Sequence, residues 1–292
     1  MFIRYGYEMS FTFPQATPVV ALLDIHRERA KDILDEEPFK ARPFASGFTG
    51  IDFFGNRYRH FVAPQGQVTI SASGVIEDIG CGDAVNCDAR ETPLSDLPPE
   101  ALFYLTGSRY CETDKLGQMA WDLFGKGPSG WARVQAICDF VHDRLSFGYE
   151  HARNTRTAAE THFERKGVCR DFAHLAITLC RAMNIPARYV NGYLGDIGVP
   201  PDPAPMDFSA WFEACLDGHW YTFDARHNVP RIGRIVVARG RDAADVPLIN
   251  SFGAHEITRF KIVAEEVASP MLDLTELSPQ PIEIPVGLRA AF

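Results

Sequence analysis

Cys169 is the residue of this chain best placed to act as a nucleophile. It follows Gly167 and Val168 and opens a stretch, residues 169–183, in which apolar side chains recur at the helical period. A cysteine at a helix N-terminus meets unpaired backbone N–H groups and the positive end of the helix dipole, and both favour the thiolate. We therefore expect a reactive thiolate here, whereas a lone free cysteine is ordinarily a small buried side chain.

The segments after this helix are predicted to be strands. Asn184 and Pro186 end the helix, because proline cannot continue its hydrogen-bond ladder and restricts the residue before it. Three runs rich in aromatic and β-branched residues follow, at residues 188–194, 208–216 and 219–224. Asp217 and Gly218 separate the last two runs and predict a tight hairpin. Asp224 then lies at the end of that hairpin.

This layout resembles the transglutaminase-like cysteine enzymes. The resemblance lies in Gly-Val-Cys-Arg-Asp-Phe-Ala-His at 167–174, Ile-Pro-Ala-Arg-Tyr-Val at 185–190, Asp-Phe-Ser-Ala-Trp-Phe-Glu at 207–213 and Trp-Tyr-Thr-Phe-Asp at 220–224. Residues 1–90, with the run Asp-Phe-Phe-Gly-Asn at 52–56, are similar to the β domain that precedes this core in bacterial members. The resemblance covers most of the chain.

The resemblance implies a catalytic site at Cys169, Ser209 and Asp224. In such enzymes the cysteine attacks an amide carbonyl, a histidine moves protons, and an aspartate holds the histidine. Cys169 aligns with the nucleophile and Asp224 with the aspartate, but Ser209 stands where the family has the histidine of its His-Ala-Trp motif. A serine hydroxyl can donate to Asp224 or hold a water, yet it does not titrate near neutrality.

The serine leaves three possibilities open. Another histidine could enter the site: His227 follows the aspartate by three residues, and His151 and His162 lie on segments before the nucleophile. His174 is about 140° around the helix from the cysteine and should face elsewhere. Alternatively, substrate or water could manage the proton for a thiolate. The third possibility is a weak or inactive domain that binds a peptide or partner without turnover.

Side chains around the motifs have structural interpretations as well. Arg170 and Asp171 could form an ion pair that caps the helix end and supports the nucleophile. Trp211 and Trp220 could line an acyl channel or pack in the core. Cys138 falls on the apolar stripe of a predicted helix and is expected in the core.

Composition excludes several classes of function. The 292 residues carry a net charge of −9 and no basic cluster, which argues against nucleic-acid binding. Seven cysteines are an odd number without disulfide-framework spacing, and Cys81 and Cys87 are too isolated for a zinc site. The N-terminus lacks a signal-peptide pattern, and the apolar run 18–23 is too short to cross a membrane. We expect a cytoplasmic bacterial protein with no membrane association and no cofactor or metal.

The predicted fold class is α+β. Alternating residues in 3–13 and 67–78 indicate strands with one buried face. Residues 51–62 have apolar runs on both sides of Gly55 and Asn56, a pair that predicts a tight hairpin. Together these strands indicate an N-terminal β-sandwich over residues 1–95. A proline-rich connection at 92–100 leads to a transglutaminase-like (papain-like) core of helices packed on an antiparallel sheet, residues 96–265. Helical periodicity in this core falls on residues 114–124, 130–145 and 157–165. Residues 266–292 are expected to form a tail that packs on the surface.

The predicted function is that of a cysteine-dependent amidohydrolase, protease or acyltransferase. As the resemblance implies, it would act on peptide or side-chain amide bonds of a peptide or protein through a thioester on Cys169, with hydrolysis favoured over cross-linking. The alternative is a transglutaminase-like binding module. Substrate identity and oligomeric state stay open at this point.

Overall fold

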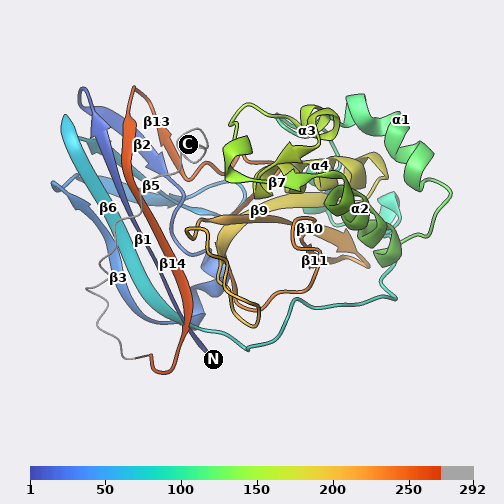
Figure 1. Cartoon of the computed structure of the whole chain (residues 1–292), viewed down its shortest axis with the longest axis horizontal. Coiled ribbons are helices and arrows are strands. Elements are labelled where there is room, and N and C mark those ends of the chain that lie inside the picture. The colour runs from blue at the N-terminus through green and yellow to red at the C-terminus, as the bar shows by residue number, and fades with distance from the viewer. Residues whose placement is uncertain (271–292) are drawn as a thin grey trace.

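The structure is a computed structural model that describes residues 1–270, and strands at both ends of this range build two sheets of a β-sandwich (Figure 1). The first sheet has the order β14-β1-β6-β3, with β1 Phe2–Phe13, β3 Ile33–Arg42, β6 Gly66–Glu77 and β14 Glu256–Val267. The second has the order β13-β2-β5-β4, with β2 Thr17–Ala21, β4 Gly47–Ile51, β5 Arg57–Ala63 and β13 Ile249–Ser251. Every pairing in both sheets is antiparallel.

The sandwich forms because its strands alternate. In β1 the residues at every second position are buried, namely Ile3, Tyr5, Tyr7, Met9, Phe11 and Phe13. They share one core with Val19 of β2 and Phe61 of β5 in the second sheet. Such alternation places one face of each strand in the core between two sheets. The predicted hairpin is confirmed, since β4 and β5 pair across the loop of residues 52–56.

The second half of the described chain places helices on an antiparallel sheet. The sheet has the order β11-β10-β9-β12, with β9 Ala187–Leu194, β10 Ser209–Leu216, β11 His219–Phe223 and β12 Arg234–Gly240. The α-helices are α1 Thr113–Phe124, α2 Trp131–Arg144, α3 Ala158–Glu164 and α4 Cys169–Ala182. Short parallel strands β7 Ser146–Phe147 and β8 Lys166–Gly167 precede α4. The 3-10 helices of the described chain are η1 Arg27–Asp32, η2 Leu94–Asp96, η3 Pro99–Tyr104 and η4 Tyr149–His151.

Helix α4 lies at the centre of this half. It contacts α1, α2, α3 and the sheet strands β9 and β10, so nearly all of its side chains are buried. The helix ends as predicted: Asn184 takes a positive φ of 62°, and the N–H of Ile185 donates to the carbonyl of Cys180 at 2.9 Å. The hairpin between β10 and β11 also forms as predicted, with Asp217 and Gly218 at φ 48° and 72°. These features confirm the α+β fold class.

The chain returns to the sandwich after the sheet β11-β10-β9-β12. Strand β14 pairs with β1 along its length, and β13 pairs with β2 (Figure 1). The predicted boundary, which assigns residues up to 265 to the helical region, differs from this arrangement, because local composition carries no signal for pairing between strands about 250 residues apart. The predicted tail, residues 266–292, lies outside the described residues from position 271 onward. Within residues 1–270 no helix has both the length and the apolar character to span a bilayer.

Candidate active site

The fold places Cys169 at the first position of α4, where its side chain is half-buried. The carboxylate of Asp171 accepts the backbone N–H of Val168 at 3.0 Å, which fixes the turn into the helix. A Cβ at Gly167 would lie 2.6 Å from the Cβ of Asp171, so only glycine fits there. Glycine at position 167 is therefore a structural requirement of this helix start.

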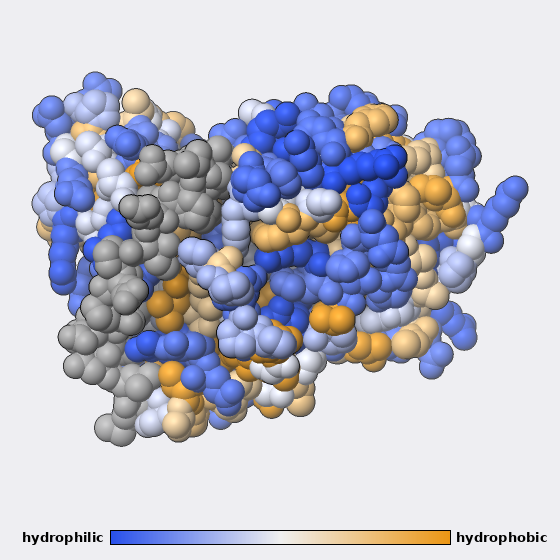
Figure 2. Space-filling view, in the orientation of Figure 1, coloured by the Kyte–Doolittle hydropathy of each residue, from blue (hydrophilic) through white to orange (hydrophobic). Residues whose placement is uncertain are grey.

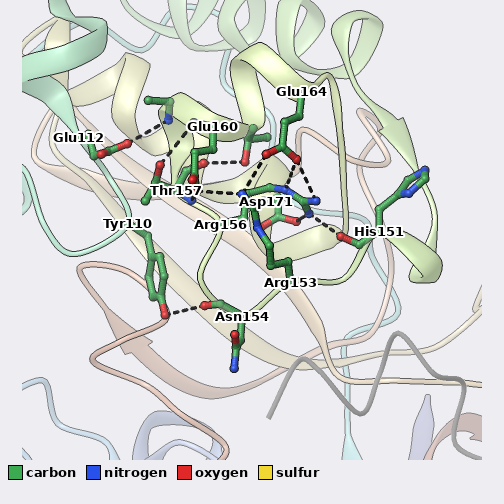
Figure 3. Close-up of polar contacts among 12 residues, drawn as sticks. Tyr110, Glu112, His151, Arg153, Asn154, Arg156, Thr157, Glu160, Glu164 and Asp171 are labelled. Carbon is green, nitrogen blue, oxygen red and sulfur yellow. Dashed lines mark hydrogen bonds and ion pairs between the residues drawn. The ribbon is translucent and has the colours of Figure 1, made fainter.

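A buried ionic network holds the same helix end (Figure 3). Arg156, whose side chain is 4% exposed, donates to Asp171 at 3.0 Å and to Glu164 of α3 at 3.2 Å. Arg153 donates to Glu164 at 2.9 Å, and the predicted pair of Arg170 with Asp171 is present at 3.4 Å. The network ties α3 and the loop before it to the first turn of α4. Over α3 and this loop the surface is mainly hydrophilic (Figure 2).

A cavity of about 350 Å³ opens beside Cys169. Its wall is mainly apolar and includes the side chains of Tyr110, Tyr149, Tyr189, Phe208, Val246 and Leu248. Cys169 and Ser209 both lie on this wall, and the backbone N–H of Ala210 donates to the sulfur. The structure thus brings the predicted nucleophile and the predicted serine to one site.

The thiol of Cys169 is not the thiolate that the sequence predicted. Burial raises the pKa of Cys169 to about 11, since desolvation penalises the charged form. The guanidinium of Arg226 lowers this pKa and the carboxylate of Asp207 raises it. The prediction was wrong because the cavity wall that desolvates the sulfur comes from segments distant in sequence.

Ser209 begins β10 and is buried, 6% exposed. It pairs with Gly192 of β9, where a Cβ would meet the carbonyl oxygen of Ile235 at 2.1 Å. Its Oγ has no hydrogen-bond partner among residues 1–270. A buried hydroxyl without a partner is costly in the free protein and available to a water or a substrate.

The carboxylate of Asp224 forms hydrogen bonds with groups other than Ser209. Its Oδ1 accepts the backbone N–H groups of Arg226 and His227 at 2.9 and 3.1 Å. Its Oδ2 contacts Nδ1 of His227 at 2.9 Å and accepts from Arg234 at 2.9 Å. Burial opposes ionisation of this carboxyl, but Arg234 and His227 outweigh it and hold the pKa of Asp224 well below its usual range.

His227 reaches the site through a second cavity, of about 160 Å³. Ser209 and His227 both line this cavity, together with Asp207 and Arg226, whereas Cys169 is not on its wall. Cys169 therefore shares a cavity wall with Ser209, whereas Asp224 is hydrogen-bonded to His227. It does not bring the thiol and the imidazole onto one wall.

The other candidate histidines have structural surroundings. His174 stacks on Tyr110 with ring centroids 5.0 Å apart, and the N–H of Ala243 donates to its Nε2 at 3.1 Å. His162 packs on Phe140, and none of the nine histidines, all within the described residues, lines the 350 Å³ cavity. As predicted, His174 faces away from the site.

The two candidate tryptophans, Trp211 and Trp220, pack against arginine side chains. Trp211 is 1% exposed beneath the guanidinium of Arg234, which lies 4.8 Å from its ring centroid. Trp220 lies under Arg188 at 4.1 Å, and neither ring lines the 350 Å³ cavity. Both side chains therefore have a packing role and do not line the candidate acyl cavity. Cys138 is buried in the core as predicted.

Asp207, Arg226 and Arg234 also belong to the site, although the motifs do not identify them. Asp207 lies two residues before Ser209, and strand alternation would have placed both side chains on one face. Arg226 lies over the ring of Phe147 at 3.6 Å, a contact that no local pattern announces. Arg234 is a charged residue inside an apolar strand, which is itself a signal of a buried partner.

Removal of Arg234 should make the fold more sensitive to acid. A carboxyl with a depressed pKa stabilises the fold above its unfolded pKa, and this contribution is lost as pH falls through the folded value. Arg234→Met raises the pKa of Asp224 towards normal, so the loss occurs at higher pH. We expect the acid-unfolding midpoint to rise by about 1 pH unit, measured by circular dichroism. Asp83→Asn, which removes the other partner of Arg234, is the matched control. An equal midpoint in Arg234→Met and wild type would contradict the role of Arg234 in lowering the pKa of Asp224.

A thiol at the start of a helix that packs on an antiparallel sheet, with an aspartate at the end of the adjoining hairpin, defines a transglutaminase-like class of cysteine enzyme fold. The family model of the transglutaminase-like superfamily matches residues 118–225. The chain is 36% identical over 233 residues to the uncharacterized protein ML0607 of Mycobacterium leprae, covering 76% of this chain and 82% of that protein. The chain belongs to the transglutaminase-like superfamily.

Two further similarities agree with this assignment. The uncharacterized protein Rv2569c of Mycobacterium tuberculosis is 38% identical over 92 residues, which cover 28% of this chain and 29% of that protein. The crystal structure of "a Putative Cysteine Protease from Cytophaga hutchinsonii" is 28% identical, with a TM-score of 0.80, and covers 98% of this chain and 94% of that one. The similarity extends through the sandwich as well as the helices.

Proposed function

We propose that this protein is a cysteine-dependent enzyme that cleaves peptide or side-chain amide bonds through a thioester on Cys169, with water favoured over an amine as acceptor. The observation that carries the proposal is the placement of Cys169, which lies at a helix start on the wall of a 350 Å³ cavity that can hold an acyl group. The similarity to the "Putative Cysteine Protease" of Cytophaga hutchinsonii supports it.

The surroundings of the thiol suit acyl transfer. Unpaired N–H groups at a helix N-terminus stabilise negative charge on an oxygen near the sulfur. The apolar wall accommodates an apolar acyl side chain. The polar 160 Å³ cavity on the other side of Ser209 has room for water, which supports hydrolysis over transfer.

Trapping of the acyl-enzyme tests the proposal. Protein with Cys81 and Cys87 replaced by serine, which removes the two exposed thiols, is mixed with N-acetyl-leucine p-nitrophenyl ester and quenched in acid. Peptide mass spectrometry should find the acyl group on Cys169, and hydroxylamine should remove it. Equal acylation of a Cys169→Ala variant, or none in either protein, would overturn the proposal.

A second candidate function is peptide or partner binding without turnover. It is favoured by the raised pKa of Cys169 and by the lack of a histidine on the cavity wall within residues 1–270. A protein of this kind would bind N-acetyl-leucine amides but form no thioester in the trapping experiment.

A histidine at position 209 should not by itself raise activity. Asp224 already receives four hydrogen bonds, which fills the acceptor sites of a carboxylate. We expect the rate of p-nitroanilide cleavage by Ser209→His to stay below about ten times that of wild type, although general acid–base catalysis typically contributes ~10²–10⁴. Ser209→His combined with His227→Ala frees one acceptor site and is the comparison. A gain of ~10² in the single variant would mean that Asp224 is open to a new partner.

A further inference from the structure

Asp207 lies on the walls of both cavities at the candidate site. It lines the 350 Å³ cavity together with Cys169 and the 160 Å³ cavity together with His227. The side chain is half-buried and interacts electrostatically with the sulfur of Cys169. No histidine of the described chain shares this position between the thiol and the polar cavity.

The charges that face Asp207 come from several elements. Cys169 belongs to α4, Tyr149 to η4, and Arg226 to the segment after β11, and each of these groups interacts with the others and with Asp207. The polar cavity adds Asp196, Asp202, His227 and Arg231. Burial raises the pKa of Asp207 to about 7, while the N–H of Phe208 and the guanidinium of Arg226 lower it. A carboxyl in this range exchanges protons at neutral pH, as acid–base catalysis requires.

We propose that Asp207 carries the proton in the Cys169 reaction, in the role that the family gives to the histidine. This inference rests on the proposed function. In acylation the Asp207 carboxylate takes the thiol proton as sulfur bonds to the amide carbon. The tetrahedral intermediate then breaks its C–N bond, and Asp207 returns that proton to the leaving nitrogen.

Hydrolysis repeats these transfers with water. Asp207 takes a proton from water as the oxygen bonds to the thioester carbon. The C–S bond breaks and the sulfur receives the proton, which restores thiol and carboxylate. No oxidant, reductant or other reactant is needed.

Asp207→Asn tests the role through two substrates that share an acyl group. Cleavage of N-acetyl-leucine p-nitroanilide needs a proton on the leaving nitrogen, whereas the p-nitrophenyl ester releases a stable phenolate. Both substrates need the thiol proton removed, but the neutral variant also lowers the pKa of the thiol and so supplies more thiolate. We therefore expect the anilide rate to fall by ~10²–10⁴ and the first-turnover ester acylation rate to fall by less than about tenfold. The wild-type anilide rate should rise with pH through about 7 as the carboxylate forms, and the variant should lose this rise.

Alkylation of Cys169 separates this role from damage to the fold. Asp207 raises the pKa of the thiol, so its neutralisation should lower that pKa and speed reaction with iodoacetamide at pH 8 by at least about threefold. A merely structural defect would not slow anilide cleavage while sparing ester acylation and speeding alkylation. Asp122→Asn, an exposed carboxyl on α1 that lines neither cavity, is the control and should change neither rate.

The outcomes distinguish the two proposals. If Asp207→Asn cleaves the anilide within threefold of wild type while Cys169→Ala is inactive, Asp207 is not the proton carrier and the proposed function stands. If Cys169→Ala cleaves the anilide as well as wild type, the proposed function falls and the role of Asp207 falls with it. Equal losses on anilide and ester would also overturn the proton-carrier role.

Discussion

Replacement of Cys169 by alanine should reduce the rate of amide cleavage by at least about 10³-fold, because the thioester route disappears with the sulfur. The side chain is half-buried on a cavity wall, so its truncation should leave the fold intact. Release of p-nitroaniline from N-acetyl-leucine p-nitroanilide measures the rate, and the thermal midpoint checks the fold.

The chain supplies its own controls for this result. Cys81 and Cys87 are exposed and lie far in sequence from the nucleophile, so Cys81→Ser and Cys87→Ser should keep full activity. Cys169→Ser keeps the size of the side chain and replaces the thiol with a far weaker nucleophile, so it should be nearly as inactive as the alanine variant. Retention of more than a tenth of the wild-type rate by Cys169→Ala would contradict a covalent role for the thiol.

Asp171→Ala should lower the free energy of unfolding by about 3–5 kcal/mol. This is the typical cost of breaking a buried ion pair by removing one partner. Asp171 is fully buried, and Arg156 would keep its charge in the interior with one partner fewer. The N–H of Val168 would also lose its acceptor at the start of the helix. Urea unfolding followed by tryptophan fluorescence measures the change.

Exposed aspartates provide the contrast. Asp122 lies on α1 in solvent and bonds Gln118 at 2.9 Å, so Asp122→Ala should stay within about 0.5 kcal/mol of wild type. Asp171→Asn keeps an acceptor oxygen and should fall between wild type and Asp171→Ala. A loss below 1 kcal/mol in Asp171→Ala would show that Arg156 finds sufficient compensation in Glu164 and the carbonyl of His151.

Local elements of the fold were predictable because local physics decides them. The period of apolar residues after Cys169 and the stop at Asn184 place the helix within about one residue of α4. Asp217 and Gly218 predict their hairpin because both residues tolerate positive φ. The pairing of β14 with β1 was not predictable in this way, since nothing near either strand specifies a partner across the whole chain.

In the candidate site, too, local sequence predicts some features and not others. Motifs locate Cys169, Ser209 and Asp224, whereas their protonation and partners depend on distant groups. The pKa of Cys169 follows from burial and from the charges of Arg226 and Asp207, and Asp224 is held by Arg234 of another strand. Resemblance therefore identifies candidate residues, but the electrostatic field that determines how they react arises only when the chain is folded.

The pairing of β1 with β14 has a consequence for synthesis of the protein on the ribosome. Strand β1 is synthesised about 250 residues before β14, and in the finished sheet it lies between β6 on one side and β14 on the other. Until residues 256–267 leave the exit tunnel, β1 presents a twelve-residue edge of unpaired backbone groups. The helical region, whose sheet is complete by residue 240, can fold earlier than the sandwich that precedes it. The open edge of β1 thus exposes the nascent chain to aggregation until β14 pairs with it and closes that edge.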